Sequence, residues 1–225
     1  MIKERIDFFK EFLTDHRWEL FNKIVADRTR YLTVVLEDIY QSQNASAVLR
    51  TCDCFGIQDV HVIENTNEFK INPDVVLGST KWLSMNQYNT LENNTISTIQ
   101  SLKEKGYRIV ATTPHTNDVE LDQFDLEKGK FALFFGSELP GLSNIVMENA
   151  DEFLKIPMYG FTESFNISVS AAIILHHLTF KLRTSEVNWK LSEHESNEIL
   201  YNWIKTSVKD SDLIEKEFNR RNNIL

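Results

Sequence analysis

Apolar runs alternate with amphipathic segments through the middle of the chain. Short runs rich in β-branched or aromatic residues are typical of buried strands, whereas the segments between them repeat their apolar positions at the helical period of about 3.6. The predicted strands are 31–37, 59–64, 82–85, 107–112, 131–135 and 153–156, and the predicted helical segments are 44–55, 95–105, a turn near 144–149 and a helix from 166. This order predicts an α/β domain with a mainly parallel sheet, whose ligands usually bind beyond the carboxyl ends of the strands.

The two ends of the chain have a different pattern. All seven glycines lie between Gly56 and Gly160 and all four prolines between Pro73 and Pro157, so both ends lack the residues that most often interrupt a helix. Residues 3–25 and 192–222 carry apolar side chains at helical spacing, with a break expected around 14–17. The sequence therefore predicts an N-terminal helical arm over 1–27, a central domain over 28–184 and a C-terminal helical arm over 185–225.

Composition is typical of a soluble globular protein. Of the 225 residues, 42% are hydrophobic and 25% are charged, which is enough apolar side chain for one substantial core. No apolar run approaches the roughly 20 residues that cross a bilayer, and the charged N-terminus lacks the core of a signal peptide. We therefore expect a cytoplasmic protein with no membrane partner.

Charge and cysteine content argue against two kinds of site. A formal charge of −9 disfavours a broad nonspecific nucleic-acid surface, because such binding needs Lys and Arg side chains to neutralise phosphates. Residues 1–30 are nearly balanced, with seven basic and six acidic side chains, and are the least repulsive segment for a phosphate backbone. Cys52 and Cys54 are the only cysteines and have no nearby His cluster, so we expect reduced thiols and no metal site.

Two connections carry polar residues where a parallel sheet would gather a ligand. The first starts the helix after 31–37, with Asn44 near the helix start and Arg50 two turns along; an Arg there can hold a phosphate through paired donors. The second follows 131–135, where Gly136, Gly141 and Pro140 build a tight loop with Glu138 at its tip. A solvent-facing helix Arg and a plain turn are the alternative interpretations.

A third connection joins the 153–156 strand to the helix from 166. Pro157 ends the strand, Gly160 allows a backbone geometry that other residues resist, and Ser164 and Asn166 bring polar side chains to a helix start. These features are typical of a strand-to-helix ligand loop, with an ordinary helix cap as the alternative. Neither a GxGxxG nor a Walker A sequence is present, which disfavours a dinucleotide-dependent enzyme.

The three connections resemble the three signature motifs of the SpoU/TrmH branch of the SPOUT methyltransferases, in the same order and spacing. The resembling sequences are NASAVLRTCDCFGI (44–57), FFGSELPGLS (134–143) and IPMYGFTESFNISVSAAI (156–173), with GSTKW (78–82) as a lesser fourth segment. The resemblance covers about residues 28–184. It implies a sheet whose C-terminal part is threaded into a deep trefoil knot, a homodimer formed around the motif helices, and S-adenosylmethionine (SAM) bound in the knot loops.

The same resemblance implies roles for individual residues. It implies that SAM is contacted, mostly through backbone groups, by Thr112, Gly136, Ile156 and Phe165. It implies a catalytic set that consists of Arg50, Asn44, Glu138, Ser164 and Asn166. In this family the Arg, helped by an RNA phosphate, engages a ribose 2′-hydroxyl, while Glu138 and Asn166 shape the site and Asn44 helps to place Arg50 or the substrate. Because a guanidinium group already carries its proton and is a poor base, orientation and charge stabilisation suit Arg50 better than literal base catalysis, and the route of the proton is left open.

A 2′-hydroxyl acceptor makes RNA, not DNA, the expected substrate class. Arg28, Arg30 and Lys81 are the candidates for a local RNA-binding patch. Two positions depart from the family pattern: Thr80 stands where close relatives often carry His, and Phe165 replaces a usual Leu beside the cofactor. The first departure bears on the RNA contacts, whereas the second is compatible with contact through the backbone.

The expected activity is SAM-dependent 2′-O-methylation of tRNA, with the D-loop guanosine at position 18 as the favoured target. Ribosomal RNA and the tRNA wobble nucleotide are the alternative substrates; the short N-terminal segment argues against the first and the helical arms argue against the second. A noncatalytic RNA-binding protein of the same fold is a further alternative. The intact set of five motif residues argues against that alternative, because a binding module has no evident need for all of them.

Overall fold

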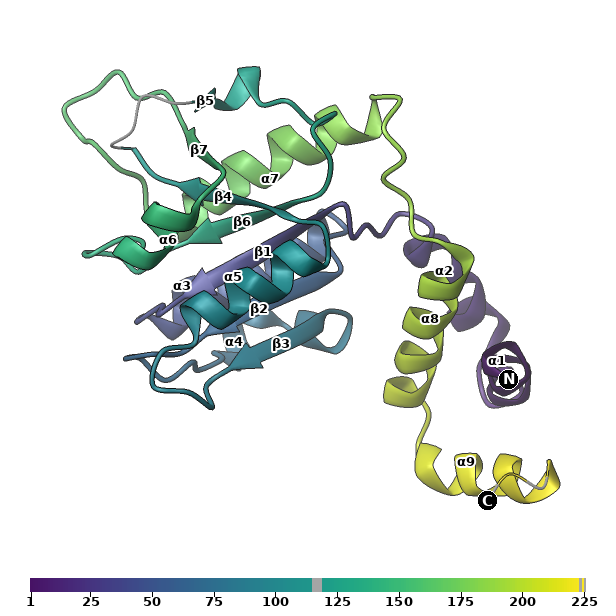
Figure 1. Ribbon diagram of the computed structural model, residues 1–225. Helices are drawn as coiled ribbons and strands as arrows, with labels where there is room; N and C mark the ends of the chain where they lie inside the picture. Colours follow the sequence, from purple (N-terminus) through teal and green to yellow (C-terminus); the bar gives the residue numbers. More distant parts are fainter. Residues whose placement is uncertain (115–118, 223, 225) are drawn as a thin grey trace. The chain divides into compact units, whose positions relative to one another are not determined.

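The computed structural model describes residues 1–114, 119–222 and 224, and its contacts divide the chain into two compact units (Figure 1). One unit contains residues 29–189, and the other combines residues 1–28 with 190–225. The segments at the two ends of the chain, which the sequence presents as separate arms, therefore belong to one helical unit. Each unit is described by itself below.

The unit of residues 29–189 is built on a seven-stranded sheet in the order β3-β2-β1-β6-β4-β7-β5, and all of its pairings are parallel in the described residues. The strands are β1 (Leu32–Glu37), β2 (Asp59–Ile63), β3 (Ser84–Tyr88), β4 (Arg108–Thr112), β5 (Val119–Glu120), β6 (Phe131–Phe135) and β7 (Glu152–Lys155). The helices are α3 (Ser42–Cys54), α4 (Pro73–Val76), α5 (Thr95–Glu104), α6 (Asn144–Asn149) and α7 (Ile167–Arg183), with short 3₁₀ turns η1 (Ser79–Lys81) and η2 (Leu121–Gln123).

Helices cover both faces of this sheet, because successive side chains of a strand point to opposite sides. Val34 on β1 packs in one cluster with residues of α3 and α7, whereas its neighbour Val35 packs in a second cluster with Ile99 of α5 and Val146 of α6. Figure 1 shows α3 and α5 on opposite sides of the sheet. The central strands are buried on both faces, which explains their nearly continuous apolar sequences.

The structure confirms the predicted α/β architecture with a mainly parallel sheet. Residues 131–135 form β6 as predicted, but the strand predicted at 82–85 is observed as β3, at Ser84–Tyr88. This edge strand contains Ser, Asn and Gln and gives only a weak apolar signal. The two-residue β5 and the single-turn α4 were not predicted.

The helical unit contains α1 (Ile2–Lys10), α2 (Asp15–Val25), α8 (Glu193–Ser207) and α9 (Ser211–Arg221). Thr14 separates the first two helices by capping α2, where its hydroxyl accepts a hydrogen bond from the Arg17 amide at 3.3 Å. Aromatic pairs join the chain ends: Phe9 packs on Tyr201, and Phe21 packs on Trp203, each with 5.8 Å between ring centroids. Within the described residues, no helix combines the length and the apolar character that a bilayer crossing requires.

Candidate functional site

A cavity of about 340 Å³ lies at the carboxyl ends of β4, β6 and β7, next to the first turns of α7. Its lining includes six of the predicted site residues, which are Thr112, Gly136, Glu138, Ile156, Ser164 and Phe165. All four predicted cofactor contacts are therefore brought together, although they come from three separate segments of the sequence. The volume and the mixed polar and apolar lining suit a small organic ligand.

The loop after β6 forms one wall of this cavity and folds tightly on itself. Ser137 and Gly141 exchange two backbone hydrogen bonds of 3.1 Å, and Gly141 has a φ of +71°. A Cβ atom on Gly136 would lie only 2.2 Å from the carbonyl carbon of Gly141. Only glycine fits at position 136, so the backbone itself forms this part of the wall.

A buried carboxylate anchors the far end of the same loop. Glu37, the last residue of β1, is 2% exposed. Its carboxylate accepts hydrogen bonds from the Ser143 amide (2.9 Å), the Ser143 hydroxyl (2.7 Å) and the Thr95 hydroxyl (2.7 Å). Glu37 was not among the predicted site residues; its signal in the sequence is a charged residue at the end of a mostly apolar strand.

Three predicted residues from the three motifs form one hydrogen-bonded chain. Asn44 Nδ2 donates to Glu138 Oε1 at 2.7 Å, and Asn166 Nδ2 donates to Asn44 Oδ1 at 3.0 Å. Asn166 also caps α7, since its Oδ1 accepts from the Ser168 amide at 2.9 Å. Gln41, which was not predicted, is a second acceptor for Asn44 Nδ2 at 3.1 Å. These contacts hold the start of α3 against both cavity loops.

Arg50 stands apart from this chain of hydrogen bonds. It lies on α3, is exposed to solvent and is not part of the cavity lining. Among the described residues, no hydrogen bond or ion pair holds its guanidinium group. Its donors are therefore available to an incoming anionic group, such as a phosphate.

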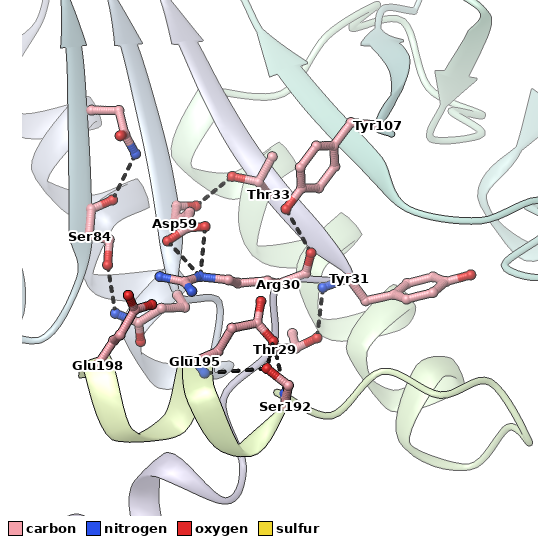
Figure 2. A network of polar contacts seen from close by, with 12 residues as sticks. Thr29, Arg30, Tyr31, Thr33, Asp59, Ser84, Tyr107, Ser192, Glu195 and Glu198 are labelled. Atoms are coloured by element: carbon pink, nitrogen blue, oxygen red, sulfur yellow. Dashed lines mark hydrogen bonds and ion pairs between the residues drawn. The ribbon is translucent and has the colours of Figure 1, made fainter. Parts of the chain in front are cut away.

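The three candidate RNA contacts have different surroundings. Arg28 belongs to the helical unit, is 3% exposed and lies 5.2 Å from the centre of the Trp203 ring. Arg30, in the sheet unit, makes an ion pair with Asp59, whose Oδ2 lies 3.0 Å from Arg30 Nε (Figure 2). Burial raises the pKa of Asp59, and Arg30 opposes this effect. Lys81 is exposed on η1 and is the most accessible of the three cations.

Figure 2 shows how the first strand of the sheet unit is held beside Arg30. The Thr33 hydroxyl donates to the Asp59 carbonyl at 2.6 Å, and the Tyr107 hydroxyl donates to the Arg30 carbonyl at 2.8 Å. Both the backbone and the side chain of Arg30 therefore have structural partners. RNA binding by Arg28 and Arg30 remains a prediction from the sequence.

Two further expectations concern Gly160 and metal binding. Gly160 does not have a positive φ, and a Cβ there would find its nearest neighbour, the Thr162 amide nitrogen, at 4.0 Å. The prediction that Gly160 adopts a backbone geometry reserved for glycine is therefore wrong, and the turn does not depend on glycine at this position. In the part of the chain that the structure describes, no group of three or more His, Cys, Asp or Glu side chains is arranged to hold a metal ion.

Comparisons with known proteins show which family the chain resembles. Residues 31–176 match the SpoU rRNA Methylase family. A tRNA (guanosine(18)-2′-O)-methyltransferase of Borreliella burgdorferi is 43% identical over 97% of this chain and 98% of its own. The crystal structure of the A. aeolicus TrmH/SpoU tRNA modifying enzyme has 29% identity and a TM-score of 0.74, covering 87% of this chain and 98% of its own. The SpoU methyltransferase AviRb of Streptomyces viridochromogenes, solved with AdoMet, shares the fold at 21% identity, with a TM-score of 0.59 over 73% of this chain and 62% of its own.

Proposed function

Because the chain belongs to the SpoU rRNA Methylase family, we propose that it transfers a methyl group from SAM to the 2′-hydroxyl of guanosine 18 in the tRNA D-loop. The observation that carries this proposal is the cavity, since it gathers the four residues predicted to contact the cofactor. A relative that is named for this activity matches nearly the whole chain. The similarity therefore includes the helical unit as well as the sheet unit.

The residues of the cavity fit SAM. The Gly136 segment has no room for a Cβ, so a ligand would meet backbone groups there. Thr112, Ile156 and Phe165 would complete the binding site, with Phe165 supplying an apolar side chain. When bound, SAM supplies an electrophilic methyl group. The protein's own task is to align the ribose hydroxyl with it and to stabilise the charge that develops on the oxygen.

Arg50 is the residue best suited to that second task. Its guanidinium is exposed and positively charged, so it can bind an RNA phosphate and stabilise a developing alkoxide at the 2′-oxygen. The hydrogen bonds among Asn44, Glu138 and Asn166 support the start of α3 and the cavity loops. In this proposal, these three residues maintain the shape of the site.

The trefoil knot and the homodimer belong to the same proposal. The parallel sheet and the likeness to a TrmH/SpoU structure support the knotted SPOUT fold. Exposed apolar side chains on α7, including Phe180 (67% exposed) and Val169 (43% exposed), support a dimer formed around the motif helices. Cytoplasmic location stays a prediction from the sequence.

The deciding experiment is methyl transfer from labelled SAM to bulk tRNA and to rRNA, followed by mapping of the modified ribose. We expect label at guanosine 18 of tRNA. Label in rRNA or at the wobble nucleotide would identify one of the alternative substrates. Measurable SAM binding without transfer to either RNA would favour the noncatalytic alternative.

The variant Arg50→Ala tests the assigned role within this activity. We expect transfer to fall by about 10²-fold or more, the scale of losing one charge-stabilising group, while the Kd for SAM stays the same because Arg50 does not line the cavity. Arg50→Lys, which keeps the charge and loses the paired donors, should retain part of the activity. Wild-type turnover by Arg50→Ala would show that the role is wrongly assigned.

A further inference from the structure

Gln41 occupies the N-cap position of α3 without capping it. Its backbone is extended, with φ −88° and ψ 114°, and its side chain makes no capping hydrogen bond. Ser, Thr, Asp and Asn are the usual residues at this position, because their short side chains reach the free backbone amides of the first turn. A residue that caps a helix poorly is expected at this position where its side chain has another function.

The other task of Gln41 is its contact with Asn44. The amide nitrogen of Asn44 donates to Gln41 Oε1 (3.1 Å) and to Glu138 Oε1 (2.7 Å), while its oxygen accepts from Asn166 Nδ2 (3.0 Å). In the flipped orientation, the Asn44 oxygen would face two acceptor oxygens, and its nitrogen would face the Asn166 amide nitrogen. Gln41 and Glu138 together therefore fix the orientation of the Asn44 amide.

We propose that Gln41 is a positioning residue for the cofactor cavity and acts through Asn44 on the two loops that line it. Glu138 belongs to the lining, and Asn166 directly follows the lining residues Ser164 and Phe165. Asn44 is only 7% exposed, and without the Gln41 oxygen its amide nitrogen keeps one of its two acceptors, Glu138. The loss of the other acceptor weakens the hold on the Asn44 amide and, through it, on the two loops. The inference rests on the proposed function in taking this cavity as the SAM site.

Gln41→Met tests the proposal because it keeps the length of the side chain and removes the acceptor. We expect the Kd for SAM, measured by calorimetry on the full-length protein, to rise about 3- to 10-fold, the range that one neutral hydrogen bond accounts for. Gln41→Glu, which retains an acceptor oxygen at the same position, should restore most of the affinity.

Gln41→Ser separates positioning from helix stability. Serine is a better N-cap than glutamine, so this variant should unfold at a higher temperature than the wild type. It cannot reach Asn44 as Gln41 does, so its affinity for SAM should nevertheless fall. A purely structural role for Gln41 would instead move stability and affinity in the same direction, and that result would overturn the proposal.

Gln43→Met is the matched control, because it makes the same chemical change two residues further on. Gln43 is exposed, and the described residues offer it no hydrogen-bond partner, so SAM affinity should not change. Unchanged affinity in Gln41→Met, or an equal loss in Gln43→Met, would overturn the positioning role. If the wild-type protein did not bind SAM, the proposed cofactor itself would be wrong, and the role of Gln41 with it. If the wild type bound SAM and Gln41→Met bound it equally well, only the role of Gln41 would be wrong.

Discussion

At the residue scale, Gly136 and Gly160 lie in two motif loops and have opposite requirements. A Cβ at position 136 would lie within 2.3 Å of three backbone atoms of Gly141 and Leu142, whereas at position 160 it would have open space. We expect Gly136→Ala to lower the free energy of unfolding by about 1–3 kcal/mol, the usual cost of overpacking, and to weaken SAM binding. Gly160→Ala should stay within about 0.5 kcal/mol of the wild type. Urea unfolding measures the stability of each variant, and SAM titration measures its affinity for the cofactor. Equal stability and equal affinity in the two variants would contradict the close contact at Gly136.

His61 gives the sheet unit a pH dependence. It is 3% exposed on β2, with Nδ1 2.9 Å from the Tyr88 hydroxyl, and burial, assisted by Lys105, lowers its pKa to about 4. The unfolded chain, with a His pKa near 6.5, binds more protons than the folded chain between these values. The stability contributed by neutral His61 is therefore complete above about pH 6.5 and is lost as the pH falls toward about 4.

We expect this single group to remove roughly 3 kcal/mol of stability across that pH range. His61→Asn keeps a polar atom near the Nδ1 position and cannot titrate. Its free energy of unfolding, measured with urea from pH 7 to pH 4, should therefore decrease less than that of the wild type. His16→Asn is the control, since His16 is exposed on α2. Parallel profiles for wild type and His61→Asn would contradict the buried-histidine explanation.

At the element scale, Glu37 joins the end of β1 to the start of α5 and to the N-cap of α6. Its carboxylate accepts three hydrogen bonds, two of them from Ser143. Glu37→Gln places an amide nitrogen, which is a donor, among donors, so we expect the free energy of unfolding to fall by about 1–3 kcal/mol. Glu92→Gln, at an exposed position, should have no effect. An equal urea midpoint for both variants would show that the Glu37 contacts do not stabilise the fold.

The elements also show what the sequence can and cannot predict. β6 was predicted to the residue because five consecutive apolar side chains are buried on both faces of a parallel sheet. The edge strand β3 was predicted two residues too early because its partly exposed side chains show no clear apolar pattern. The predicted parallel sheet indicated that these loops gather at one edge, yet the hydrogen bond from Asn44 to Glu138 joins residues 94 positions apart, and no local pattern encodes it. Glu37 was missed for the same reason, since its partners Thr95 and Ser143 lie 58 and 106 positions away. Gln41 was missed although its partner Asn44 is only three positions away, because a glutamine before a helix does not by itself indicate a contact.

At the scale of the whole molecule, the helical unit depends on both ends of the chain. Phe9 of α1 and Phe21 of α2 are buried against Tyr201 and Trp203 of α8. Deletion of 190–225 alone would expose these apolar faces to water, and we expect that variant to aggregate. The sheet unit has its own two buried clusters, with all members between residues 31 and 189. Deletion of both 1–28 and 190–225 should therefore leave a monodisperse protein.

The doubly deleted variant also separates cofactor binding from the rest of the activity. Every residue that lines the cavity belongs to the sheet unit, so we expect the variant to bind SAM with the affinity of the full-length protein. Light scattering after size-exclusion chromatography and SAM calorimetry provide the two measurements. A variant that is monodisperse and unable to bind SAM would show that the cavity needs the helical unit for its shape. Retained SAM binding would instead make the two terminal segments the place to look for tRNA contacts, because residues 1–30 carry little net charge in an otherwise acidic chain.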